Sequence, residues 1–220
     1  VAGRARRDPV EADRIVLGEL PEFPHLPELP ARGPGAELIG RGAALLVDFP
    51  VELTSTGWAV TGRAGRDLRR SRSWLGDDLD LLEERAADRH GPFKIQAAGP
   101  WTRAASSELR SGEKLLADSG ACKDLAASLA EGLAGHVAEV QDRLPEATVV
   151  VQLDEPTLPA VLAGAVPTAS HLRMLPAVQS DDAVIALGAV RAAMPAGTTV
   201  VAHCCASGVP VGLLQRAAMD

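Results

Sequence analysis

Apolar and polar positions follow a regular pattern over the second half of the chain. Continuous apolar runs, typical of strands buried on both faces, occur at 93–98, 148–153 and 198–203. Longer stretches whose apolar residues recur at three- and four-residue spacing predict helices at 113–143, 181–194 and 209–218. The alternation of strand and helix predicts an α/β fold with a parallel sheet, either a doubly wound sheet or a (β/α)8 TIM-type barrel.

The first half of the chain has shorter and weaker patterns. A helix is predicted over 8–20, with Asp8 as its N-cap and Pro9 at its first position. The stretch 21–34 is rich in proline, and we expect no regular structure there. After it the pattern predicts a helix, a pair of strands and a long amphipathic helix, at 36–48, 51–62 and 67–90.

Polar or conformationally special residues follow three predicted strands, at 99–101, 154–155 and 203–205. Functional residues of a (β/α)8 barrel lie at the carboxyl ends of its strands, so this coincidence favours the barrel over the doubly wound sheet. A full barrel usually needs ~250 residues. This chain has 220 residues and too few strand patterns. We therefore expect residues 1–220 to form a single (β/α) barrel domain that is truncated or has missing segments.

Charge and composition narrow the possible partners and the compartment. A net charge of -7 argues against nucleic acid or an anionic membrane as the main partner. No apolar run approaches the ~18 residues needed to span a bilayer, and no signal-peptide pattern is present at the start. Three cysteines, two of them adjacent, do not make a disulfide framework, so we expect a cytoplasmic protein with reduced thiols.

His203, Cys204 and Cys205 form the first candidate site. Residues two apart on a strand point to the same face, so His203 and Cys205 are predicted to project together, with Cys204 pointing away. Imidazole nitrogen and thiolate are ligands that Zn²⁺ favours. The alternative is that the cysteines are small core residues. A histidine at a strand end fits that alternative less well, because a buried imidazole needs partners for both nitrogens.

Gln152 and Asp154 form the second candidate site, because the same alternation places them on one face and Glu155 on the other. An inward carboxylate at a strand end can hold a substrate ammonium group or act as a base, although a helix cap or a salt bridge explains it equally well. Trp101, in the segment 96–102, is a candidate pocket wall, with core packing as the alternative. His25 can also reach a site, but nothing in the sequence fixes its direction.

Three motifs in this order resemble the C-terminal catalytic barrel of cobalamin-independent methionine synthases. They are GPWT at 99–102, QLDEPTL at 152–158 and the His-x-Cys of 203–205. The proline-rich LPEFPHLPELPARGPG at 20–35 is similar to single-barrel, actinobacterial members of that family. The motifs span roughly half the chain. QLDEP followed by His-x-Cys at barrel spacing is the most specific part of the likeness.

The resemblance implies a zinc-dependent methyltransferase that makes methionine from homocysteine. It implies Zn²⁺ held by a His, two Cys and a Glu, with His203 and Cys205 as two of these ligands. The remaining two ligands, the Glu and the second Cys, are expected beyond Asp220. It also implies that Asp154 binds the ammonium group of homocysteine, while Gln152 and Trp101 belong to the substrate pocket. Methyltetrahydrofolate and a methyl-corrinoid are both possible methyl donors.

Two alternatives to this function stay open at the level of the sequence. Related barrels alkylate other thiols with zinc or decarboxylate uroporphyrinogen without a metal. The decarboxylase needs arginines for the propionate groups of its substrate, and the chain offers little for this beyond Arg4, Arg6 and Arg7. The second alternative is a non-catalytic, truncated barrel. Titration of its metal-loaded form with homocysteine would give no thiol-dependent signal.

Overall fold

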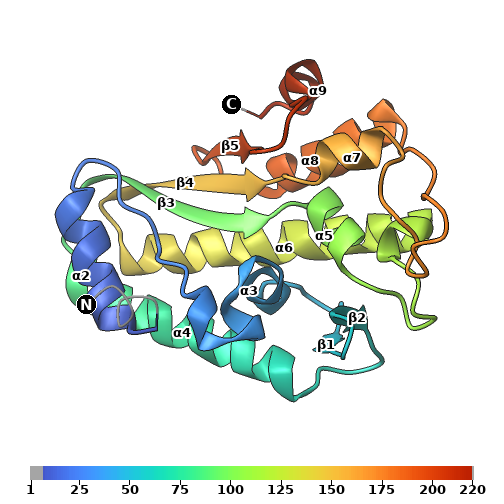
Figure 1. The fold of residues 1–220 in the computed structure, drawn as a ribbon. Helices are drawn as coiled ribbons and strands as arrows, with labels where there is room; N and C mark the ends of the chain where they lie inside the picture. Colours follow the sequence, from blue (N-terminus) through green and yellow to red (C-terminus); the bar gives the residue numbers. More distant parts are fainter. Residues whose placement is uncertain (1–6, 220) are drawn as a thin grey trace.

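The computed structural model describes residues 7–219. It is a mixed α/β structure in which helices cover one side of a small parallel sheet (Figure 1). The strands are β1 (Val51–Leu53), β2 (Trp58–Val60), β3 (Gly91–Ala98), β4 (Ala147–Asp154) and β5 (Thr199–His203). The α-helices are α2 (Pro9–Glu19), α3 (Leu38–Ala44), α4 (Arg66–Ala86), α5 (Pro100–Ser106), α6 (Ser119–Arg143), α7 (Leu158–Leu162), α8 (Ser180–Ala193) and α9 (Val211–Arg216).

Helix α2 forms where the sequence predicts it. The side chain of Asp8 accepts hydrogen bonds from the backbone N–H groups of Val10 and Glu11, which satisfies two donors that have no partner inside the helix. Pro9 occupies the first helical position, where a missing N–H has no cost. The N-cap prediction is confirmed.

The expectation that 21–34 has no regular structure is wrong in two places. Short 3₁₀ turns form at Pro30–Arg32 and Pro34–Ala36, each begun by a proline that fixes a helical φ. His25 also forms a parallel bridge with Lys94, so this segment lies along the edge of β3. The Lys94 N–H donates to the carbonyl of Pro24, and the Leu26 N–H donates to the carbonyl of Lys94, both at 2.9 Å.

Helix α3 is shorter than the predicted span of 36–48. It begins after Glu37, whose carboxylate accepts from the N–H groups of Ile39 and Gly40. The strands predicted within 51–62 are confirmed as an antiparallel hairpin, β1 with β2. The long amphipathic helix is confirmed as α4.

Strands β3, β4 and β5 form a parallel sheet in that order. The register aligns Ala98 with Asp154, and Asp154 with His203, so the carboxyl ends of the three strands lie together. Helix α6 was predicted to begin at 113, but it begins at Ser119. Asp118 stops it from extending backwards, because its side chain accepts from the N–H of Ala121 as an N-cap.

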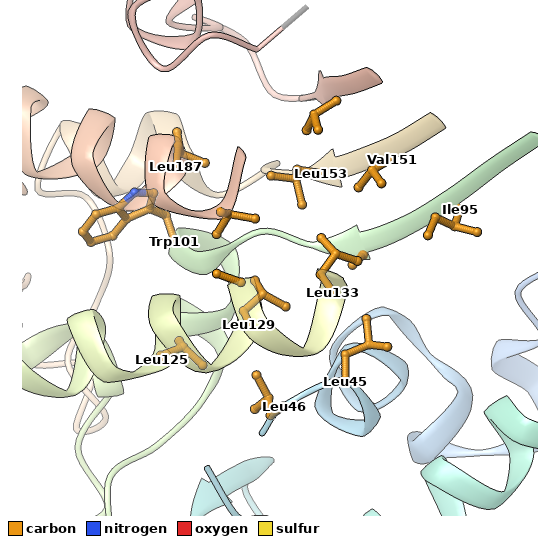
Figure 2. Packing of buried hydrophobic residues seen from close by; sticks show 14 of the residues in the cluster. Leu45, Leu46, Ile95, Trp101, Leu125, Leu129, Leu133, Val151, Leu153 and Leu187 are labelled. Atoms are coloured by element: carbon orange, nitrogen blue, oxygen red, sulfur yellow. The ribbon is translucent and has the colours of Figure 1, made fainter. Parts of the chain in front are cut away.

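The sheet has one apolar face, and the core lies against it. Ile95, Val151 and Leu153 are fully buried and face Leu129 and Leu133 of α6 (Figure 2). Complete burial of one such side chain contributes about 1.5–3 kcal/mol. Alternation sends the neighbouring residues of each strand to the opposite face, where the polar side chains gather.

The prediction of a parallel α/β fold is confirmed. The prediction of a (β/α)8 barrel is met only in part, since within residues 7–219 the parallel strands form an open three-stranded sheet and no closed barrel. None of the helices in that same range is long and apolar enough to cross a membrane.

Candidate functional site

The three predicted strand-end positions meet at one edge of the sheet. Gly99 follows β3, Asp154 ends β4 and His203 ends β5. Asp154 and His203 are direct register partners, and the N–H of Gly99 donates to the Asp154 carbonyl at 2.9 Å. The structure therefore brings together residues that lie about fifty or more positions apart in sequence.

Asp154 and His203 form the centre of the candidate site. Nδ1 of His203 lies 2.6 Å from Oδ1 of Asp154. An ionised carboxylate can only accept, so Nδ1 carries the proton and Nε2 offers a lone pair when the ring is neutral. Nε2 makes no hydrogen bond with residues 7–219, and the side chain of His203 is 51% exposed. The ring is thus held at one nitrogen and open at the other.

Gln152 lies on the same face as Asp154, as the alternation predicts. Its Nε2 donates to Oδ1 of Asp154 at 2.8 Å, and its Oε1 accepts from Nζ of Lys94 at 3.0 Å. The other Asp154 oxygen, Oδ2, accepts no hydrogen bond within residues 7–219 and is not sealed from solvent. One carboxylate oxygen is therefore occupied, and the other can receive a ligand.

Glu155 points into the core, on the opposite face from Asp154. It is fully buried, and its carboxylate accepts from the N–H groups of Trp101 and Thr102 at 2.9 and 2.7 Å and from the Thr102 hydroxyl at 2.7 Å. Burial raises the pKa of Glu155 to about 7. Its own N–H donates to the carbonyl of His203 at 2.8 Å. Glu155 thus links β4, β5 and the start of α5.

The two sequential cysteines lie just beyond β5. Cys204 is half-buried and Cys205 is exposed. Strand β5 ends at His203, so the alternation used to pair Cys205 with His203 does not extend to Cys205. Within residues 7–219, no group of three or more His, Cys, Asp and Glu side chains is placed to hold a metal ion.

The structure places the indole of Trp101 in the hydrophobic core. The residue is 5% exposed, and its indole N–H donates to the carbonyl of Ala183 in α8 at 3.3 Å. Figure 2 shows the ring beside Leu187. The backbone N–H of Trp101, which binds Glu155, is the part that adjoins the site. The indole itself is not brought to Asp154 and Gln152.

Four polar residues, His25, Glu28, Lys94 and Gln96, extend the site along the polar face of the sheet. The bridge with Lys94 places His25 beside the site, and burial followed by the charge of Lys94 lowers the pKa of His25. Burial raises the pKa of Glu28, which the charge of Asp154 also reaches. The sequence held a signal for Lys94, since it and Gln96 alternate with Phe93 and Ile95. Glu28 gave no signal, because it lies in a proline-rich segment without periodicity.

Comparison of the chain with known proteins identifies no relative. No family model, no curated protein and no solved structure matches it significantly.

Proposed function

We propose that this chain is part of a (β/α)8 barrel methyltransferase similar to cobalamin-independent methionine synthases. The substrates are homocysteine and a methyl donor, methyltetrahydrofolate or a methyl-corrinoid, and the product is methionine. The observation that carries the proposal is the Asp154–His203 pair at the carboxyl ends of adjacent parallel strands, with Nε2 of the imidazole open. Functional groups of parallel α/β folds lie at this edge.

The donor set fits a zinc ion in part. A zinc-bound histidine almost always donates its second ring N–H to a carboxylate or carbonyl, and His203 does so to Asp154. Cys205, an exposed thiol two residues further on, would supply the sulfur ligand. Catalytic zinc usually has three protein ligands. The proposal therefore requires at least one protein donor beyond His203 and Cys205.

The chain's own residues would then bind and orient the amino acid. Bound zinc would supply deprotonation of the substrate thiol and keep its sulfur nucleophilic. Oδ2 of Asp154 would accept a hydrogen bond from the substrate ammonium group, while Oδ1 stays engaged with His203 and Gln152. Gln152 would hold the carboxylate in this orientation.

Metal analysis of the full chain tests the zinc site. We expect about one equivalent of zinc in the purified protein, and His203→Ala and Cys205→Ser are each expected to lower it strongly because each removes a ligand. His90→Ala and Cys204→Ser are matched controls, since His90 is an exposed histidine elsewhere and Cys204 adjoins the proposed ligand. Equal zinc in His203→Ala and the wild type would sink the proposal.

A pair of thiols tests the substrate. In the cobalt-substituted chain, a thiolate that joins the metal gives a charge-transfer absorption band. Homocysteine should give this band at lower concentration than 4-mercaptobutanoate, which lacks the ammonium group. Asp154→Asn should reduce that preference, because it removes the charge that binds the ammonium. An equal response to the two thiols would exclude ammonium binding by Asp154. Assays of methyl transfer with methyltetrahydrofolate and with a methyl-corrinoid then identify the methyl donor.

A further inference from the structure

A chain of side-chain hydrogen bonds crosses all three parallel strands. It begins at Lys94 in the middle of β3, runs through Gln152 and Asp154 on β4, and ends at His203 on β5. The donor–acceptor distances are 3.0, 2.8 and 2.6 Å. All of these side chains project from the same face of the sheet, so the contacts follow from strand alternation and register.

The direction of each bond in this chain is determined by chemistry. An ammonium group has donors only, so the amide oxygen of Gln152 must face Lys94. The amide NH₂ group therefore faces Asp154, whose carboxylate oxygen accepts it. The same oxygen accepts the Nδ1 proton of His203, which leaves Nε2 as the nitrogen with the lone pair.

We propose that Lys94 is a positioning residue, which fixes the tautomer of His203 through Gln152 and Asp154. The bond from Lys94 to Gln152 is charge-assisted and stronger than a neutral one. Without it, the Gln152 amide loses the anchor on its oxygen, so its NH₂ group holds the Asp154 carboxylate less rigidly. The carboxylate can then rotate, and its bond to Nδ1 of His203 would weaken.

Nitrogen NMR of the metal-free full chain tests this role directly, because the two ring nitrogens of a neutral imidazole differ strongly in chemical shift. The His203 signal is assigned by its loss in His203→Gln. We expect the Nδ1–H tautomer in the wild type, a mixture of tautomers in Lys94→Met, and the wild-type pattern in Lys94→Arg, which keeps the charge and a donor. Lys123→Met, at an exposed lysine on α6, is the matched control.

A wild-type ring protonated at Nε2, or an unchanged pattern in Lys94→Met, would overturn the proposal. Gln152→Met provides a second route, because it breaks the link and keeps the charge of Lys94. It must shift the tautomer in the same direction as Lys94→Met. If Lys94→Met does not fold, an unchanged tautomer in Gln152→Met would still overturn the proposal, because Lys94 can act on His203 only through Gln152.

The consequence for metal binding rests on the proposed function. Loss of a group that orients a ligand typically weakens metal affinity 10- to 100-fold. Since Lys94 acts through two other side chains, we expect about 10-fold weaker zinc binding in Lys94→Met, with recovery in Lys94→Arg. A wild-type chain that binds no zinc would contradict the proposed function and leave the tautomer result intact. An unchanged tautomer with normal zinc binding would contradict only the role of Lys94.

Discussion

The buried carboxyl group of Glu155 makes stability depend on pH near neutrality. Burial raises the pKa of Glu155 from its ordinary value of 4.5 to about 7, so between these values the folded chain holds a proton that the unfolded chain has released. The stabilisation that the protonated Glu155 gives the folded chain is fully present below the pKa of this group in the unfolded chain. It is lost as the pH rises through about 7. By linkage the loss is on the order of 3 kcal/mol.

Denaturant unfolding at several pH values checks this expectation. The free energy of unfolding of the wild type, minus that of Glu155→Gln, should fall between pH 5 and pH 8, because the amide does not titrate. Glu84→Gln, at an exposed glutamate of α4, should keep the wild-type dependence. A difference that is constant over this range would show that Glu155 does not titrate there.

At the scale of single residues, strand alternation predicted one part of the site. It placed Gln152 and Asp154 on one face, and their hydrogen bond confirms this. It did not place Cys205, because the strand ends at His203 and the period of two ends with it. The buried contacts of Glu155 were also beyond prediction, since they join Glu155 to Trp101 and Thr102 through a turn that has no repeating pattern.

At the scale of elements, the junction between β3 and α5 leaves no room for a side chain at Gly99. A Cβ atom added there would lie 2.3 Å from Oε1 of Glu155. The Glu155 side chain is fully buried and cannot move out into solvent to make room. The φ angle of Gly99 is an ordinary -71°, so close approach is the reason for the glycine. The close approach lets the Glu155 carboxylate accept hydrogen bonds from the N–H groups of Trp101 and Thr102 at the start of α5.

Gly99→Ala is therefore expected to lower the free energy of unfolding by about 1–3 kcal/mol, the usual cost of overpacking. Gly135→Ala is the matched control on α6, because a Cβ there meets nothing within 4 Å. It should raise stability by about 0.5–1 kcal/mol through better helix propensity. Thermal or denaturant unfolding of both variants measures this, and equal stability of Gly99→Ala and the wild type would contradict the close contact.

Elements with several full periods of hydrophobic spacing were predictable from the sequence. Helices α4 and α6 and strands β3 and β4 are of this kind. The short helices α5 and α7 were not predicted, since each spans about two turns or fewer and has a proline at its first or second position instead of a repeating pattern. Element ends depend on single caps, as at Asp118, and these act outside the periodic signal.

At the scale of the whole molecule, a buried ion-pair cluster ties the N-terminal third together. Asp78 on α4 lies 2.5 Å from Arg32 and 3.0 Å from Arg41 on α3. The Asp78 and Arg41 side chains are only 6% and 8% exposed. Arg32 and Arg41 lie 46 and 37 positions from Asp78 in the sequence. The hydrophobic periodicity of the sequence does not predict such distant pairs.

Asp78→Ala is expected to lower the free energy of unfolding by about 3–5 kcal/mol, because it leaves the buried guanidinium of Arg41 without its counter-charge. The adjacent Asp77→Ala removes an exposed carboxylate from the same helix and should change stability by less than about 0.5 kcal/mol. Denaturant unfolding measures both. If the two variants unfold alike, the cluster does not stabilise the fold.

The proline-rich segment that lies along β3 has a consequence for self-association. Pro21, Pro24, Pro27 and Pro30 recur at every third position, and proline has no N–H to donate. The segment pairs with β3 through Pro24 and Leu26, yet it cannot present a continuous row of donors on its outer side. A bare edge strand is a template for further strands, as in amyloid. The proline-rich segment therefore covers the β3 edge of the sheet and does not itself offer an edge to which a strand of another molecule can pair.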